Sequence, residues 1–194
     1  DYGLINQEAF QNELLKTCKG IQWLNETAKL IKSENKISEV ICSSGLKLKA
    51  RLVIDASGHK SKFIKRPFLK EVAQQAAYGI VGKFSTPPVK KDQFVLMDFR
   101  SDHLEDEELL KSPSFLYAMD LGSETYFVEE TSLASYPSFS QDHLKKRLLS
   151  RLNNKGIKVV EIFHEENCLF PMNLPLPYKN QSVLGFGGAA SMVH

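Results

Sequence analysis

The segment that most constrains the fold is residues 125–133, in which an aromatic and β-branched run leads directly into two adjacent glutamates, Glu129 and Glu130. The run favours a β-strand. Because successive side chains of a strand point to opposite faces, we expect one carboxyl group on the apolar face and the other on the reverse face. Desolvation on an apolar face raises the pKa of a carboxyl group and suits it to general acid catalysis. The same pattern is also typical of a strand that ends in two solvated acids before a turn.

Composition limits the class of protein. The chain has 194 residues, of which 42% are hydrophobic, and a formal net charge of +2. That is enough apolar material for a sizeable core, and the net charge is too small to indicate a nucleic-acid partner. No apolar run approaches the roughly 18 residues of a membrane span. We therefore expect a globular chain whose membrane contact, if any, is peripheral.

The cysteines and histidines indicate neither a disulfide framework nor a metal site. The three cysteines are odd in number and far apart, and no two of the five histidines have the spacing of metal ligands. We expect the thiols to be reduced and partly buried. The cysteines are Cys18, Cys42 and Cys168.

The first third of the chain predicts a short helix, a small antiparallel sheet and a buried strand. Asn6 is a suitable N-cap for an amphipathic helix that ends at Gly20. Segments of mixed polarity up to residue 48, with a turn at residues 43–45, predict an antiparallel meander with one solvated face. An apolar run then enters the sequence Asp-Ala-Ser-Gly at residues 55–58, which predicts a buried strand that ends in a carboxylate and a tight turn.

Residues 77–131 predict several antiparallel strands, with a hairpin turn at residues 120–123. Gly79 and Gly82 lie within one of these strands and indicate that another group approaches its backbone closely. A last strand at residues 182–186 leads into a pair of glycines.

Between these segments, residues 140–156 predict a helix that begins at Ser140, ends at Gly156 and has leucines at helical spacing. Its basic residues are expected on the other faces, where they could contact either anionic lipid headgroups or solvent. These residues are Lys145, Lys146, Arg147 and Arg151.

Several short motifs, in this order, carry a resemblance to a known family. Residues 127–131 read FVEET where that family has FLEET, and residues 97–100 read MDFR where it has MDWR. Residues 113–119, 77–80, 168–177 and 185–194 match further motifs, and residues 2–6 match one whose arginine is missing here. Over its whole length the chain resembles the plant and cyanobacterial lycopene cyclases, flavoproteins of carotenoid biosynthesis.

The resemblance implies a mixed α/β fold of the glutathione-reductase and hydroxylase kind, in which an FAD-binding domain is interleaved with an antiparallel substrate-binding sheet. Residues 1–75 would belong to the FAD-binding domain, residues 76–139 to the substrate sheet, residues 140–181 to a helix and strand that return to the core, and residues 182–194 to a C-terminal FAD-contacting segment. The family's GxGxxG unit would precede Asp1 and is not in this chain. We therefore expect an internal fragment that is inactive alone.

The resemblance also implies site residues. Glu129 would be the acid–base residue, Glu130 and Asp98 its carboxylate partners, and Arg100 would hold one of those partners in place. No metal is implied. FAD, reduced by NAD(P)H, would lie against two glycine turns, whose residues are Asp55, Ser57, Gly58, Gly187, Gly188 and Ala189.

The implied function is redox-neutral cyclisation of the linear ends of lycopene, or of a related linear carotenoid, by an isomerase (intramolecular lyase). The β-type of ring is favoured over the ε-type. Two alternatives stay open: an FAD-dependent monooxygenase or reductase of the same fold acting on an isoprenoid, and a non-catalytic carotenoid- or lipid-binding fragment. The related capsanthin and neoxanthin synthases share the motifs. We expect the protein to bind peripherally to the cytoplasmic side of a bacterial membrane, with a cyanobacterium as the expected source. In a eukaryote the expected location is the plastid.

Overall fold

A computed structural model describes residues 5–192 and separates the chain into two compact units, Asp1–Val53 and Ile54–His194. The matched motif at residues 2–6 and the end of the motif at residues 185–194 therefore lie partly outside the described residues. The four-part domain division stays a prediction.

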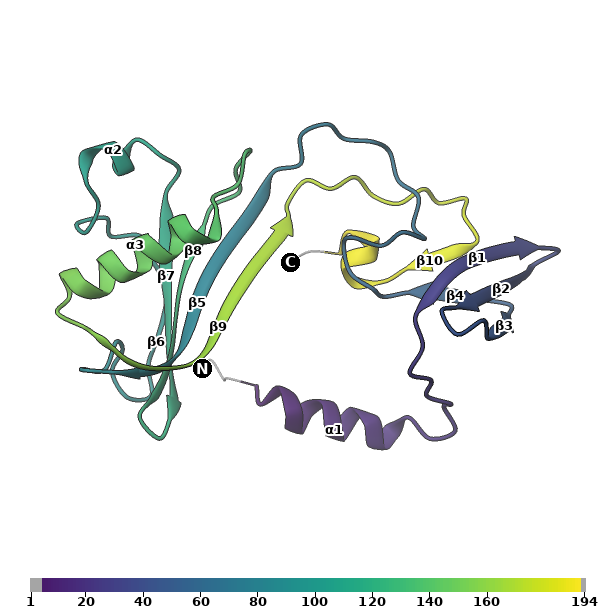
Figure 1. Cartoon of the computed structure of the whole chain (residues 1–194), viewed down its shortest axis with the longest axis horizontal. Coiled ribbons are helices and arrows are strands. Elements are labelled where there is room, and N and C mark those ends of the chain that lie inside the picture. The colour runs from purple at the N-terminus through teal and green to yellow at the C-terminus, as the bar shows by residue number, and fades with distance from the viewer. Residues whose placement is uncertain (1–4, 193–194) are drawn as a thin grey trace. The chain divides into compact units, whose positions relative to one another are not determined.

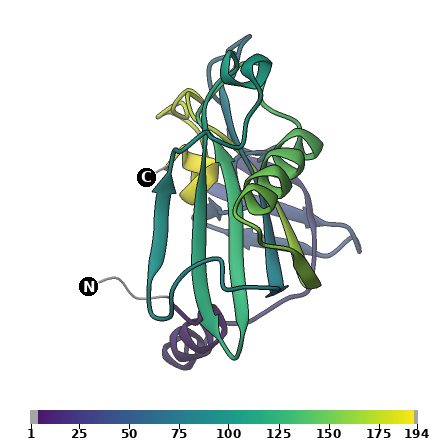
Figure 2. The same cartoon turned by 90° about the vertical axis from the view of Figure 1, so that its left-hand side faces the viewer.

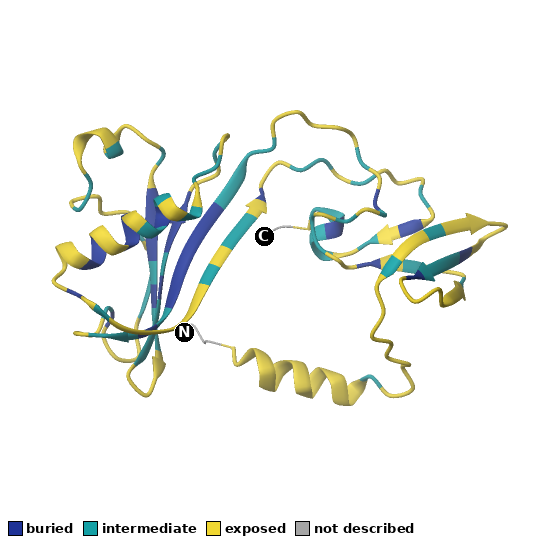
Figure 3. Ribbon diagram, in the orientation of Figure 1, coloured by how far each residue is buried: buried dark blue, intermediate teal, exposed yellow. Residues whose placement is uncertain are grey.

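The first unit contains the predicted helix and meander. Helix α1 (Gln7–Thr17) begins at Asn6, whose side chain accepts a hydrogen bond from the amide of Ala9 at 2.9 Å, as its capping role predicts. None of the helical side chains is buried, so the apolar stripe is exposed (Figure 3). The antiparallel sheet that follows consists of β1 (Ala28–Glu34), β2 (Ile37–Cys42) and β3 (Lys47–Ala50).

The second unit is built around a five-stranded antiparallel sheet with the strand order β6-β7-β8-β5-β9 (Figure 1). The predicted antiparallel block is therefore confirmed, with β7 and β8 forming the expected hairpin. A short helix, α2 (Asp106–Leu109), connects β6 to β7. The strands are β5 (Gln74–Phe84), β6 (Phe94–Asp98), β7 (Ser114–Gly122), β8 (Thr125–Ser132) and β9 (Val159–Pro171).

Helix α3 (Gln141–Asn154) covers one face of this sheet (Figure 2). Its first turn is capped by Ser140, as predicted, and its buried leucines pack on apolar side chains of β5, β7 and β8. We call this side of the sheet the helix face. The core consists mainly of Tyr78, Ile80, Leu116, Val128, Leu144, Leu148 and Leu152.

The expectation that all four basic residues of α3 lie on its outer faces is wrong for Arg147 and Arg151. Both side chains are only 2% exposed, because they follow Leu144 at the spacings that return to the same side of a helix. Each reaches a carboxylate there: Arg147 pairs with Glu108 at 3.1 Å and Arg151 with Glu130 at 2.7 Å. No helix within residues 5–192 has the length and hydrophobicity needed to cross a bilayer.

A second, two-stranded sheet pairs β4 (Val53–Asp55) with β10 (Val183–Gly185). Asp55 is buried at the end of β4, and its carbonyl accepts a hydrogen bond from the amide of Phe186 at 2.8 Å. The chain then enters the 3₁₀ helix η1 (Gly187–Ala190). This pairing brings the two predicted glycine turns together.

The two glycines of β5 permit close approaches, as the sequence indicated. A Cβ atom on Gly82 would lie 2.1 Å from the carbonyl oxygen of Glu161, where the register of β5 and β9 shifts. A Cβ atom on Gly79 would lie 2.7 Å from the ring of Phe127. Gly82 therefore has no room for a side chain, and a side chain at Gly79 would have to displace the ring of Phe127.

Gly82→Ala is expected to destabilise the protein by about 1–3 kcal/mol, because the added methyl group would push β9 away from β5. Urea unfolding measures the loss. Gly122→Asn is the matched control: a Cβ atom added there would meet no atom within 4 Å, and asparagine tolerates the positive φ of that turn. Equal midpoints for Gly82→Ala and the wild type would contradict the crowding described above.

Candidate active site

Glu129 lies on the face of the sheet opposite to α3, which we call the open face. Its neighbours along β8, Val128 and Glu130, are fully buried on the helix face. Alternation therefore places Glu129 on the reverse side, together with Phe127 and Thr131. The two adjacent glutamates thus occupy opposite faces, as the strand pattern predicts.

The environment of Glu129 suits a group that holds a proton. Burial raises the pKa of its carboxyl group, and the negative charge of nearby Glu166 raises it further. The hydroxyl of Thr131 donates a hydrogen bond to the carboxylate at 2.7 Å, which opposes part of this effect. The net result is a raised pKa, the direction that a general acid requires.

Aromatic side chains lie beside Glu129 on the open face, on the side of β7. Tyr117 is its direct cross-strand neighbour on β7, and Phe115 lies two residues further along that strand. The ring centroids of Phe115 and Tyr117 are 5.1 Å apart, and Phe99 packs on Phe115 at 4.9 Å. None of these three residues is among the site residues predicted from the sequence. Aromatic residues at alternate positions of the strand opposite the glutamates are the signal that could have found two of them.

Glu130 and Asp98, which the sequence analysis paired with Glu129, do not meet it, because both belong to the helix face. Glu130 is completely buried and receives two hydrogen bonds from Arg151, each 2.7 Å long, and one from Ser114 at 2.6 Å. Asp98 lies opposite Leu116, a core residue beneath α3. The three carboxylates therefore do not repel one another as expected. Each of them has its own partners.

The expected contact between Arg100 and Asp98 is present. The Nε atom of Arg100 donates to Asp98 at 2.8 Å, and Lys155 beyond the end of α3 lies 3.2 Å from the same carboxylate. The hydrogen bonds from Arg100 outweigh desolvation and hold the pKa of Asp98 well below its usual range. Asp98 is therefore ionised at neutral pH and links β6 to α3.

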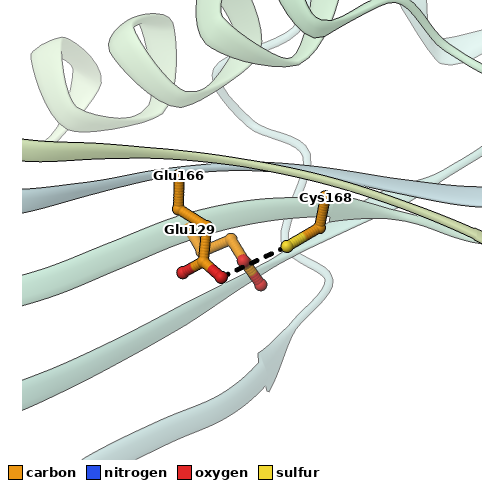
Figure 4. A group of neighbouring side chains, drawn as sticks. All are labelled: Glu129, Glu166 and Cys168. Atoms are coloured by element: carbon orange, nitrogen blue, oxygen red, sulfur yellow. Dashed lines mark hydrogen bonds between the residues drawn. The ribbon is translucent and has the colours of Figure 1, made fainter. Parts of the chain in front are cut away.

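Two residues of β9 meet Glu129 instead (Figure 4). Glu166 and Cys168 point toward Glu129. One carboxylate oxygen from each glutamate and the sulfur of Cys168 all lie within 4.8 Å of one another. The thiol of Cys168 donates to Glu166 at 3.2 Å, and burial raises the pKa of this thiol to about 12. Glu166 is not among the site residues predicted from the sequence. Its spacing of two residues from Cys168 is the local signal that places both on one strand face.

The predicted cofactor residues of the first turn are held by Asp55. Its carboxylate accepts a hydrogen bond from the amide of Ser57 at 2.8 Å and another from the hydroxyl of Ser61. Burial would raise the pKa of Asp55, but these hydrogen bonds outweigh it and lower the pKa. Gly58 follows with a φ of +89°, which only glycine adopts freely.

The second turn packs directly against the first. A Cβ atom on Gly188 would lie 3.0 Å from the amide nitrogen of His59 and 3.2 Å from the Cα atom of Gly58. Gly187 also has a positive φ, and Ala189 is fully buried. Arg66, which the sequence analysis missed, donates to the carbonyl of Ala189 at 2.7 Å. The structure therefore brings all the predicted cofactor residues into one place.

A cavity of about 370 Å³ opens beside these turns. Its wall is largely apolar, yet the Nε2 atom of His59 is buried there without a hydrogen-bond partner among the described residues. An orphaned polar atom and a close backbone pair suit a flat ligand with polar edges, such as a flavin. Phe170 of the wall follows Glu166 and Cys168 on the same strand face, about 13 Å from Glu166 at the rise of a strand. The wall includes His59, Gln75, Phe170, Met172, Leu174, Gly188 and Met192.

Arg151→Met is expected to destabilise the protein by about 3–5 kcal/mol, because it leaves the buried Glu130 without its partner. The double variant Glu130→Leu with Arg151→Met should recover most of the loss, since it removes both charges. Denaturant unfolding of the two single variants and the double variant measures the coupling. Arg100→Met, at a side chain that is 71% exposed, is the control and should cost much less. A loss for Arg151→Met no larger than that of the control would contradict the structural role of the pair.

Known proteins match this chain over its whole length. The family model described as "Lycopene cyclase protein" matches residues 1–194. The chain is 54% identical over 196 residues to the lycopene beta cyclase of Synechococcus elongatus, with 100% of this chain and 48% of that protein covered. It is 36% identical to the chloroplastic lycopene beta cyclase of Solanum lycopersicum, with 100% of this chain and 40% of that protein covered. The chain therefore spans about half the length, or less, of the curated relatives it matches.

Solved structures share the fold at low sequence identity. A geranylgeranyl bacteriochlorophyll reductase-like protein from Thermoplasma acidophilum superposes with a TM-score of 0.68 at 16% identity and covers 99% of this chain and 50% of that chain. A flavoprotein/dehydrogenase from Cytophaga hutchinsonii has a TM-score of 0.55 at 14% identity and covers 94% and 45%. These likenesses confirm the predicted mixed α/β flavoprotein fold class. With a family model that matches the chain from its first residue to its last, the chain belongs to the lycopene cyclase family.

Proposed function

We propose that the full-length protein cyclises the linear ends of lycopene, or of a related linear carotenoid, to β-rings. By full-length protein we mean this chain together with the flanking sequence that completes the length of its relatives. The observation that carries the proposal is Glu129, a carboxyl group whose pKa is raised by burial on an aromatic face of the sheet. Membership of the lycopene cyclase family supports the choice of substrate.

Glu129 supplies the proton that begins the reaction. Transfer of that proton from its carboxyl group to the terminal double bond of the polyene leaves a carbocation, which the neighbouring double bond attacks to close the ring. The Glu129 carboxylate then takes a different proton from the cyclised cation, which forms the ring double bond. The protein ends with the same number of protons, and neither substrate nor protein is oxidised, so the enzyme is an isomerase of the intramolecular lyase kind.

The aromatic side chains stabilise the cation. Tyr117 is the cross-strand neighbour of Glu129, and Phe127 lies along the same strand, so the faces of their rings can stabilise a passing positive charge. Such apolar surroundings also exclude water, which would otherwise capture the carbocation. Glu130 and Asp98 serve in this scheme by holding β8 and β6 against α3, and Arg100 serves by pairing with Asp98.

FAD is the proposed cofactor, and its site is the pair of glycine turns. The residues that would hold it are Asp55, Ser57, Gly58, Gly187, Gly188 and Ala189. His59 would offer a ring nitrogen that has no hydrogen-bond partner within residues 5–192. When bound and reduced by NAD(P)H, the flavin supplies negative charge that stabilises the cation. Arg66 keeps the second turn in place through its hydrogen bond to Ala189.

The protein is proposed to meet its hydrocarbon substrate at a membrane surface by peripheral contact. A linear carotenoid dissolves in lipid rather than in water, so the enzyme must take it from a bilayer. The cyanobacterial and chloroplastic relatives support a cyanobacterial or plastid setting. Contact from the cytoplasmic side of a cyanobacterial membrane is the arrangement that we propose.

Glu129→Gln in the full-length protein is expected to reduce cyclisation by about 10²–10⁴-fold, because the amide cannot donate the proton. The flavin absorbance should stay unchanged, since Glu129 lies outside the glycine turns. Incubation with lycopene, FAD and NADPH, followed by product chromatography, measures the effect. Glu124→Gln, at the exposed tip of the β7–β8 hairpin, is the matched control and should behave as the wild type.

The same incubation separates the candidate functions. A cyclic product without net consumption of NADPH supports the cyclase. An oxygenated or reduced product with stoichiometric consumption would instead identify a flavin monooxygenase or reductase. Binding of lycopene without any product would identify a carotenoid-binding protein. A normal yield from Glu129→Gln would refute the role of that residue.

Gly188→Val in the full-length protein should lower the amount of flavin that co-purifies, because its side chain would force the two turns apart. The flavin-to-protein absorbance ratio measures this effect, and circular dichroism checks that the protein remains folded. Ala56→Ser, at an exposed position of the first turn, is the control. Undiminished flavin content in the folded valine variant would contradict the placement of the cofactor.

A further inference from the structure

Glu129 and Glu166 belong to strands that do not touch each other, yet their side chains meet. In the five-stranded sheet, Gly79 of β5 pairs with Glu129 of β8 on one side and with Glu166 of β9 on the other. Neighbouring strands lie about 4.8 Å apart, so the two glutamate backbones are separated by roughly twice that distance. Only a position without a side chain between them lets two carboxyl groups converge over the middle strand.

The geometry around Gly79 agrees with this reading. A Cβ atom there would lie 2.7 Å from the ring of Phe127 and 3.4 Å from the Cβ atom of Glu129. One oxygen from each carboxyl group and the sulfur of Cys168 lie within 4.8 Å of one another. Two carboxyl groups at this separation, half-buried, repel each other when both are ionised.

Cys168 orients Glu166. Its thiol donates a hydrogen bond to the carboxylate of Glu166 at 3.2 Å, and it stays protonated at any physiological pH. Cys168 itself pairs across the ladder with Ala77, another small residue of β5. The donor therefore holds the Glu166 carboxylate beside Glu129.

The other titratable groups on this part of the open face are few. Within the described part of the second unit, the ladder places Tyr117 beside Glu129 and His164 beyond Glu166. Glu165 points to the helix face, where it contacts Tyr78 and Lys145. Glu166 is thus the carboxylate that faces Glu129 most closely, while Glu165 faces away.

We propose that Glu166 is a positioning residue for the cyclisation: its negative charge, held by the thiol of Cys168 and brought over Gly79, keeps the proton on Glu129 until the substrate takes it. The inference rests on the proposed function of Glu129 and goes beyond it by naming the charge that controls the acid. No step adds or removes electrons. The proton leaves the Glu129 carboxyl group for the polyene, and the pair regains one proton when the cyclised cation loses its own.

The test is the pH dependence of kcat/KM for lycopene cyclisation by the full-length protein. Glu129 donates only while protonated, so activity falls as the pH rises through its pKa. Removing the charge in Glu166→Gln lowers that pKa and should move this limb to lower pH by about 1 unit. At a pH above the limb the rate should then fall about tenfold. Glu166→Asp keeps the charge and should retain most of the wild-type profile.

Glu165→Gln is the matched control, because it removes the same charge from the next residue on the opposite face of β9. Its profile should superpose on that of the wild type. An infrared titration of the protonated carboxyl C=O stretch, assigned by its absence in Glu129→Gln, reports the same shift without turnover. If Glu166→Gln does not fold, Glu166→Thr removes the charge with a residue that strands favour, and the expected shift is the same.

Three results would overturn the inference. An unshifted limb for folded Glu166→Gln or Glu166→Thr, with Glu129→Gln inactive, would refute the role of Glu166 and leave the proposed function standing. Full activity of Glu129→Gln would refute both. Loss of wild-type activity on treatment with a chelator would show that the three side chains hold a divalent cation rather than a proton.

Discussion

The buried ion pair between Glu130 and Arg151 determines which face of the sheet each glutamate of β8 occupies. A slip of one residue in the pairing of β8 would exchange the faces of Glu129 and Glu130. Such a slip would place Glu129 under α3 and leave Arg151 facing the wrong side chain. The pair, with its two hydrogen bonds of 2.7 Å, therefore favours the observed register of β8. Specifying a register is a better-attested role of buried charges than adding net stability.

The chemical character of the open face depends on this register of β8. With Glu130 committed to Arg151, Glu129 is left on a surface of aromatic and small side chains, where burial raises the pKa of its carboxyl group. The same alternation in β6 sends Asp98 toward α3, and the next residue, Phe99, packs on Phe115. Adjacent residues of one motif thus have different roles: one stabilises the packing of α3 on the sheet, and the next lies on the open face. The motif alone does not show which residue has which role.

Local patterns predicted much of the fold and part of the site. The capping of α1 and α3, the β7–β8 hairpin and the opposite faces of Glu129 and Glu130 follow from short-range rules, and the structure has them all. The grouping of Glu129 with Asp98 and Glu130 failed because both expected partners lie on the helix face. Alternation along β8 sends Glu130 there, and Asp98 lies opposite the core residue Leu116 of β7. Arg147 and Arg151 were placed outward because a helical pattern treats charge as solvated, whereas each arginine here has a buried or half-buried carboxylate to meet.

The bare backbone at Gly79 has a wider consequence for how such a pair of acids can be built. The separation of the Glu129 and Glu166 backbones is set by the interstrand hydrogen bonds on both sides of β5, and the missing side chain at Gly79 lets their carboxyl groups approach each other. Ladder spacings vary little, so the sheet holds the backbones of the two acids at a nearly constant separation. Residues elsewhere on the open face can therefore differ, and different hydrocarbon ends can be accommodated, while the backbone separation of the two acids stays the same.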